Sequence, residues 1–188
     1  EEIHLPRYNF VTRVQSGPIG RPMRLGKDEV AVCEGIHALN DDIAAYCPDA
    51  FRLYISARSV VVDNDGREVF KGTWMRLLRR LVRDSNFRGT PAAATLDMWA
   101  NVRRGEKRFI SPFKERANLM FDSSFPCEVS ILKNYAAPLL AAVPEGAERY
   151  AEIRSILPAL ERFETIDPAL LAPESMLREF IGGGVYSY

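Results

Sequence analysis

Five arginines lie between residues 76 and 88, with Asp84 as the only acidic residue among them. Three of them, Arg76, Arg80 and Arg83, are spaced i, i+4 and i+7, which places them on one face of a helix. Apolar residues at 77, 78, 81 and 82 recur at helical spacing on another face. A guanidinium is always charged and presents a fork of N–H donors, so several on one face suit a polyphosphate. The pattern indicates a helix anchored on one side and able to bind an anion on the other.

An alternative interpretation is an ordinary solvated helix face. Arg80 and Asp84 form an i, i+4 pair, and such a pair stabilises a helix by only about 0.2–0.5 kcal/mol. Against this, the positive charge is concentrated in one segment of a chain that is neutral overall. Like charges this close repel, so a bound anion would relieve a cost.

A second candidate site follows the apolar run 29–33, which is typical of a strand buried in a parallel sheet. The run ends in Glu34-Gly35. Open α/β sheets bind ligands at the carboxyl ends of their strands, where a carboxylate can hold Mg²⁺ directly or through water. The alternative is a turn that begins with a charged residue.

Composition restricts the class of protein. The 188 residues contain 25 Lys and Arg and 25 Asp and Glu, so no overall basic field favours nucleic acid, and we expect a small-molecule ligand. Three widely spaced cysteines indicate neither a disulfide framework nor a zinc site. No apolar run is long enough to cross a bilayer, and the first residues do not form a signal peptide. We expect a cytoplasmic protein, and a homo-oligomer is possible.

The remaining pattern alternates between sheet and helix and predicts the α/β class. We expect a mostly parallel, incomplete sheet flanked by helices over residues 1–143 and a helical extension over 144–188 that packs on it. Residues 1–29 are expected to form loops or a hairpin. Strands are expected at 29–33, 51–56, 118–122 and 126–132, and a hairpin at 60–70 around Asp65-Gly66. Helices are expected at 40–46, 73–89, 91–102 and 135–143, followed by a tail that Pro158 bends or breaks and a last short helix that ends at Gly182.

Basic residues also surround the junction between the two central helices. Gly89 is expected to end the first helix, and Thr90-Pro91 to cap and start the second. That second helix is expected to end in Arg103-Arg104-Gly105. Together the two helices could form a lid over phosphates, or the basic residues after the second helix could belong to a solvated loop.

These pieces resemble the uridine kinase and phosphoribulokinase-like branch of the P-loop kinases, from about residue 5 to about residue 140. The motifs are Pro6-x-Tyr8-Asn9-Phe10-Val11, Glu34-Gly35-Ile36, Arg76-Leu-x-Arg79-Arg80-x-x-Arg83-Asp84-x-x-x-Arg88-Gly89 and Ala117-Asn-Leu-Met-Phe121. Phe87-Arg-Gly-Thr, Val102-Arg-Arg-Gly-Glu106 and Leu177-Arg-Glu-Phe-Ile-Gly-Gly183 look like the bacterial uridine kinase-like subgroup. In that subgroup a domain similar to part of threonyl-tRNA synthetase often precedes the kinase.

The resemblance implies an ATP-dependent kinase that uses Mg²⁺ and transfers the γ-phosphate to a hydroxyl of a nucleoside, uridine-like, or of a related small molecule. It implies roles for ten residues: catalysis for Arg80, Arg83 and Arg88; substrate binding for Tyr8, Arg13 and Arg76; phosphate binding for Arg79, Arg103 and Arg104; and metal binding for Glu34. Arginines suit this reaction because its transition state spreads negative charge over oxygens.

Two kinds of departure from the family accompany the matches. Asn9, Arg13, Thr90 and Met98 stand where the uridine–cytidine kinases have aspartate, histidine, arginine and glutamine, which opens the choice of acceptor. No GxxxxGKS/T motif occurs in the 188 residues, so we expect a carboxyl-side portion whose P-loop segment lies upstream. The alternatives are a non-catalytic module that binds nucleotide or RNA phosphate, and an interaction domain with solvated arginines.

Overall fold

The computed structural model describes residues 3–4, 8–9, 14–15 and 22–186. The chain forms two compact units, Glu1–Ala38 and Leu39–Tyr188. In the first unit, β1 (Ile3–His4) pairs antiparallel with β4 (Pro22–Met23), and β2 (Tyr8–Asn9) pairs antiparallel with β3 (Val14–Gln15). Short antiparallel pairs agree with the hairpin-like character expected for this segment.

The strand expected at 29–33 is absent, and that prediction was wrong. Residues 24–35 have no regular secondary structure, and Val30 and Val32 are 85% and 91% exposed. An apolar run becomes a buried strand only when neighbouring strands pair with it and helices cover it. Among the described residues, none pairs with 29–33.

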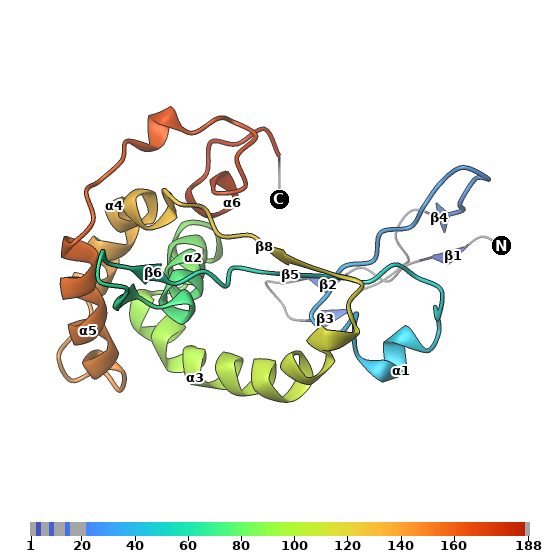
Figure 1. Ribbon diagram of the computed structural model, residues 1–188, viewed down its shortest axis with the longest axis horizontal. Helices are drawn as coiled ribbons and strands as arrows, with labels where there is room; N and C mark the ends of the chain where they lie inside the picture. The colour runs from blue at the N-terminus through green and yellow to red at the C-terminus, as the bar shows by residue number, and fades with distance from the viewer. Residues whose placement is uncertain (1–2, 5–7, 10–13, 16–21, 187–188) are drawn as a thin grey trace. The chain divides into compact units, whose positions relative to one another are not determined.

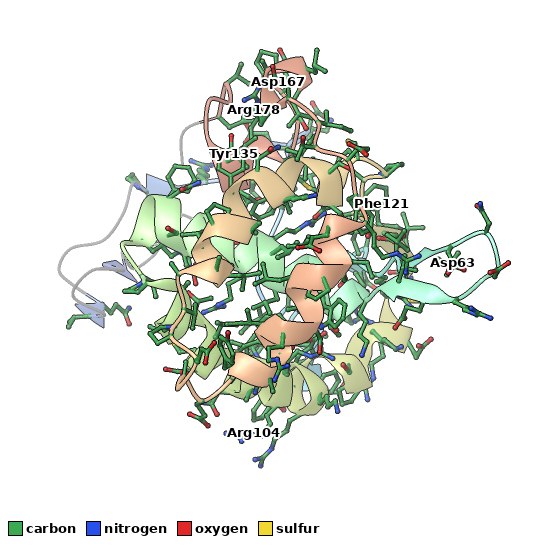
Figure 2. All side chains as sticks on the ribbon, turned by 90° about the vertical axis from the view of Figure 1, so that its left-hand side faces the viewer. Asp63, Arg104, Phe121, Tyr135, Asp167 and Arg178 are labelled. Atoms are coloured by element: carbon green, nitrogen blue, oxygen red, sulfur yellow. The ribbon has the colours of Figure 1, made fainter. Side chains whose placement is uncertain are left out.

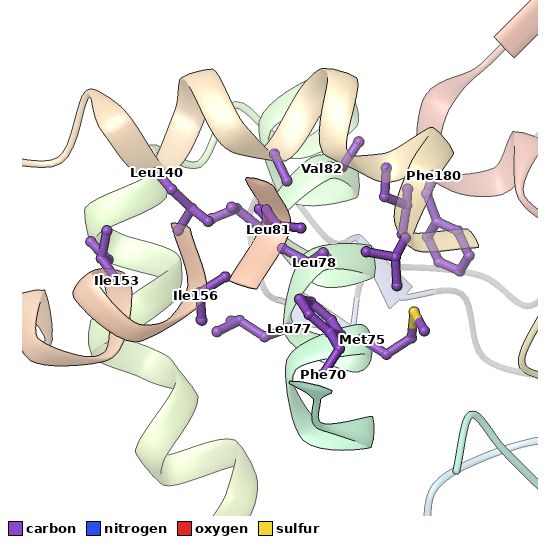
Figure 3. Packing of buried hydrophobic residues seen from close by; sticks show 14 of the residues in the cluster. Phe70, Met75, Leu77, Leu78, Leu81, Val82, Leu140, Ile153, Ile156 and Phe180 are labelled. Atoms are coloured by element: carbon purple, nitrogen blue, oxygen red, sulfur yellow. The ribbon is translucent and has the colours of Figure 1, made fainter. Parts of the chain in front are cut away.

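The second unit is built around α2 (Gly72–Arg88), which contacts α3 (Ala92–Phe109), α4 (Glu128–Ala141) and α6 (Arg178–Ile181) (Figure 1). One face of α2 is buried through Met75, Leu77, Leu78, Leu81 and Val82. Figure 3 shows these side chains meeting residues of α4, α5 (Tyr150–Glu161) and α6. The helical extension after residue 143 therefore shares the core of α2, because Ile153, Ile156 and Phe180 are buried in it.

The sheet of the second unit has two parallel strands, β5 (Leu53–Ser56) and β8 (Leu119–Asp122), which run side by side in Figure 1. Leu53 faces Leu119, and Ile55 faces Phe121. Successive side chains of a strand alternate between faces, so these four apolar residues share one face of the sheet. Between 43% and 55% of each residue is exposed, and that face has no covering layer among the described residues.

Two short elements flank β5 in the chain, a short helix before it and a hairpin between it and α2. The helix α1 (Asp41–Ala44) starts at Asn40, whose side chain accepts a hydrogen bond from the Asp42 N–H. The expected hairpin is present as β6 (Val61–Val62) and β7 (Glu68–Phe70), which pair antiparallel. Its turn is held by Asp63 Oδ1, which accepts hydrogen bonds from the N–H groups of Asp65 and Arg67. Gly66 takes the positive φ of 77° that the turn requires.

Three helix predictions need correction. The strand expected at 126–132 is absent: residues 126 and 127 form a turn and 128–132 begin α4, because Glu128, Ile131 and Leu132 are buried at helical spacing against α2. The helix α3 continues through Gly105 to Phe109, and its N-cap is Pro91 without a side-chain hydrogen bond, so Thr90 does not cap it. The helix α5 continues through Pro158 to Glu161, within the packed core that holds Ile156 and Leu160. By contrast, α2 ends as expected, with Gly89 in the left-handed conformation.

Candidate active site

Three arginines of α2 project from the side of the helix that the apolar residues leave free. Met75, Leu78 and Val82 point into the core, and Arg76, Arg80 and Arg83 follow one another along the opposite side. About a quarter of each of these three arginine side chains is exposed. The amphipathic pattern of the helix therefore fixes a row of cations at the surface of the second unit.

Asp84 is the centre of the first cluster in this row, which we call the Asp84 cluster. The carboxylate is only 2% exposed, and three guanidinium groups surround it. Arg83 donates from Nη2 and Nε to Oδ1, over 3.0 and 3.2 Å. Arg80 Nε lies 3.2 Å from Oδ2, and Arg88 Nη1 lies 3.4 Å from Oδ1. Three positive charges share one negative charge, so the cluster keeps a formal excess of two.

The Asp84 cluster is electrostatically unfavourable for its own cations. Burial lowers the pKa of Arg80; Asp84 raises it, and Arg83 and Arg88 lower it. Arg80 Nε is also buried without a hydrogen bond of good geometry. Buried polar groups normally have such partners, and a cation beside other cations is stabilised by added negative charge. The cluster has the charge and the donors of an oxyanion site.

Glu106 on α3 holds the second cluster. Its carboxylate is 11% exposed and binds Arg76 Nη1 at 2.5 Å and also Arg103 Nη1. Arg76, predicted to bind substrate, thus lies near Arg103, predicted to bind phosphate. Arg76 also lines a cleft of about 430 Å³ at the carboxyl end of β5, together with Tyr54, Ser56 and Lys114. Such strand ends are where open α/β sheets bind ligands.

Arg79, predicted to bind phosphate, lies inside the protein in this structure. Its guanidinium binds the carboxylate of Glu128, which is fully buried, with Nη2 at 2.6 Å from Oε2. Nη2 also donates to the carbonyl oxygen of Ser123 over 2.6 Å, and the guanidinium lies 5.2 Å from the ring centroid of Phe180. These contacts use most of its donors, so Arg79 joins α2 to α4 and α6.

The other predicted site residues lie apart from the two clusters or outside the described structure. Arg104 projects from α3 into solvent and donates to Asn101 (Figure 2). Glu34 is exposed in the irregular segment of the first unit. The backbone of Tyr8 is described in β2 but its side chain is not, and Arg13 lies outside the described residues. Within the described residues no group of three or more His, Cys, Asp or Glu gathers as a metal site.

Asp122, at the carboxyl end of β8, is a strongly hydrogen-bonded acid that the sequence analysis did not single out. Oδ1 accepts from the Arg58 N–H at 3.0 Å and from the Ser124 hydroxyl at 2.7 Å, and Oδ2 accepts from the Ser59 hydroxyl at 2.9 Å. Partial desolvation raises the pKa of Asp122, but these hydrogen bonds outweigh it and hold the pKa well below its usual range. The signal was an acid ending a strand, followed by two serines.

Fold and site together define the class of this protein. A parallel strand pair flanked by helices, with arginines gathered on the central helix, is an incomplete α/β fold of the P-loop kinase type. The chain belongs to the Phosphoribulokinase / Uridine kinase family, whose model matches residues 1–129. Membership indicates a phosphotransferase of the kinase type that uses ATP. No curated protein and no solved structure matches the chain. No helix of the described residues is long and apolar enough to cross a membrane.

Proposed function

We propose that this chain is the acceptor-binding and arginine-bearing part of an ATP-dependent kinase whose acceptor is a nucleoside, uridine-like, or a related small molecule with a free hydroxyl. The observation that carries the proposal is the Asp84 cluster, in which three guanidinium groups share one buried carboxylate and keep an excess of positive charge. Family membership supplies the reaction class.

In this reaction the acceptor oxygen forms a bond to the γ-phosphorus of ATP, and the bond from that phosphorus to the leaving oxygen of ADP breaks. The hydroxyl proton passes to a general base. Negative charge spreads over the phosphoryl oxygens in the transition state. Arg80, Arg83 and Arg88 act on that charge, and Arg76 orients the acceptor from the cleft beside β5.

Mg²⁺ in a kinase needs few protein ligands, so this chain could supply a single one. Mg²⁺ in kinases keeps several waters and is bound by one or two carboxylates together with substrate phosphates, whose negative charge it neutralises. Glu34 is exposed, and it is the one residue of this chain that we propose as a ligand of Mg²⁺.

We propose in addition that a P-loop segment outside these 188 residues completes the site. No GxxxxGKS/T motif is present here, although kinases of this type use that loop to hold the phosphates. The exposed apolar face formed by Leu53, Ile55, Leu119 and Phe121 supports this proposal. Apolar surface of this kind is normally buried under further strands or helices.

The test is an ADP-release assay on the complete gene product, with uridine, cytidine and other hydroxyl acceptors. Arg80→Gln should lower kcat by about a hundredfold or more with little change in KM, because it removes a cation that acts on the transition state. Arg154→Gln is the matched control, since Arg154 is exposed on α5 outside both clusters, and it should change kcat less than about twofold. Equal rates for Arg80→Gln and the wild type would remove the Asp84 cluster from the mechanism.

The alternative is a non-catalytic module that holds nucleotide phosphate, favoured by the absence of a P-loop motif from this chain. The same ADP-release assay distinguishes the kinase from the non-catalytic module. A module binds Mg-ATP through the Asp84 cluster and releases no ADP with any acceptor, even as the complete gene product.

A further inference from the structure

The three ion pairs of the Asp84 cluster differ in quality. Arg83 makes two hydrogen bonds to Oδ1 from a neighbouring position in the chain. Arg80 and Arg88 approach through one nitrogen each, at 3.2 and 3.4 Å, and neither contact is a hydrogen bond of good geometry. Asp84 thus anchors Arg83 and holds Arg80 and Arg88 loosely.

The loosely held arginines are also free to reach a ligand. Arg88 is 52% exposed and Arg80 is 24% exposed. Neither makes an ion pair with any other described carboxylate. Among the described residues, no hydrogen bond is formed by their remaining nitrogens. Hydrogen bonds from charged donors to phosphate oxygens are about twice as strong as neutral ones. A phosphate dianion offers more oxygens and more charge than the single carboxylate.

We propose that Asp84 is a positioning residue that acts as a resident counter-ion: Arg80 and Arg88 turn from Asp84 to a bound phosphate group, while Arg83 stays with Asp84. The inference deepens the proposed function, on which its relevance to phosphoryl transfer rests. Asp84 keeps the three guanidinium groups together before the ligand arrives and competes with the ligand for two of them.

A resident counter-ion gives a result that a purely structural carboxylate does not give. Removing its charge leaves three unneutralised cations, so phosphate should bind more tightly even though the free protein becomes less stable. A carboxylate that only supports the fold would leave phosphate binding unchanged or weaken it when it is lost.

The experiment titrates inorganic phosphate into the 188-residue chain by isothermal calorimetry, with ionic strength held constant by chloride. We expect Asp84→Asn to lower the Kd for phosphate about tenfold. Asp84→Glu, which restores the charge, should return the Kd to within about twofold of the wild type. Asp97→Asn is the matched control, because Asp97 is exposed on α3 outside the cluster, and it should leave the Kd unchanged. Unchanged or weaker binding by Asp84→Asn would overturn the proposal, as would the absence of phosphate binding in all four proteins.

A second comparison applies even if Asp84→Asn does not fold. Arg88→Gln should weaken phosphate binding about tenfold with little change in melting temperature, whereas Arg83→Gln should lower the melting temperature with a smaller effect on the Kd. Equal weakening by the two variants contradicts the division of roles. Because these measurements need no catalysis, an inactive kinase would refute the proposed function and leave the role of Asp84 standing.

Discussion

Asp84 and Glu106 show how few carboxylates are needed to gather arginines on one surface. The buried Asp84 and the part-buried Glu106 together hold five arginines, and neither acid neutralises its partners fully: Arg76, Arg80, Arg83, Arg88 and Arg103. A buried carboxylate keeps guanidinium groups close together despite their repulsion, and the unneutralised charge stays available to a ligand. Arg79 instead stabilises the fold, because Glu128 pairs with this one arginine alone.

Arg79 gives a prediction at the scale of the residue. Arg79→Met should destabilise the protein by about 3–5 kcal/mol, because Glu128 would remain fully buried without its partner. The double variant Arg79→Met, Glu128→Leu should recover most of this loss, since apolar residues of similar volume remove the unpaired charge.

Urea denaturation of the two variants and the wild type measures the effect. A free energy of unfolding for Arg79→Met within 1 kcal/mol of the wild type would show that water or another residue satisfies Glu128. Phosphate affinity should stay constant throughout the series, because Arg79 lies outside the Asp84 cluster.

At the scale of the element, periodicity predicted the helices better than it predicted the strands. The leucine and arginine spacing defined α2, and Gly89 defined its end. Residues 126–132 include β-branched side chains and were interpreted as a strand, but 128–132 form the start of α4, where they pack against α2. A short apolar run is compatible with a strand or with a helix, and the elements that pack against it determine which one forms. Residues 29–33 show the same dependence, because among the described residues they have no strand to pair with.

The candidate site was predictable where one element carries it. Arg76, Arg80 and Arg83 belong to a single helix, so their common face follows from spacing alone. Two of the arginines of α2 pair with acids that lie on other helices. Glu106 reaches Arg76 from α3, and Glu128 reaches Arg79 from α4; neither pairing has a signal in the sequence. Local pattern thus found the cations, but tertiary packing assigned one to the interior.

Gly72 carries the prediction that belongs to this scale. It opens α2 where the helix passes the end of β5, and a Cβ there would lie 3.0 Å from the carbonyl oxygens of Arg58 and Ser59. Both contacts are with backbone, so the segments would have to move apart. We therefore expect Gly72→Ala to destabilise the protein by about 1–3 kcal/mol, although alanine favours helices.

Gly105→Ala is the control for Gly72→Ala, because Gly105 lies within α3 and an added Cβ meets nothing within 4 Å. It should stabilise the protein by about 0.5–1 kcal/mol through helix propensity. Thermal unfolding followed by circular dichroism compares the two variants. If both shift the melting temperature in the same direction, the close approach at Gly72 does not constrain the start of α2.

For the whole molecule, the distribution of charge matters more than its sum. The chain contains equal numbers of acidic and basic residues, yet the two clusters around Asp84 and Glu106 bring five arginines to two acids. Neutrality overall removes a general attraction for polyanions, so anion binding must be local. Local binding to the folded state is coupled to stability, because an anion that the unfolded chain does not bind shifts the equilibrium toward the folded protein.

We therefore expect phosphate or sulfate to raise the melting temperature above its value in chloride at equal ionic strength. For a Kd near 1 mM, phosphate at about 20 mM would stabilise the folded protein by about 2 kcal/mol, which corresponds to several degrees for a unit of this size. Sulfate also strengthens apolar burial in general, so the difference must depend on the Asp84 cluster. Arg80→Gln should remove most of the difference between phosphate and chloride, whereas Arg154→Gln, a change at an exposed position of α5, should retain it. Equal melting temperatures in phosphate and chloride would show that the arginines of α2 are solvated cations without a ligand.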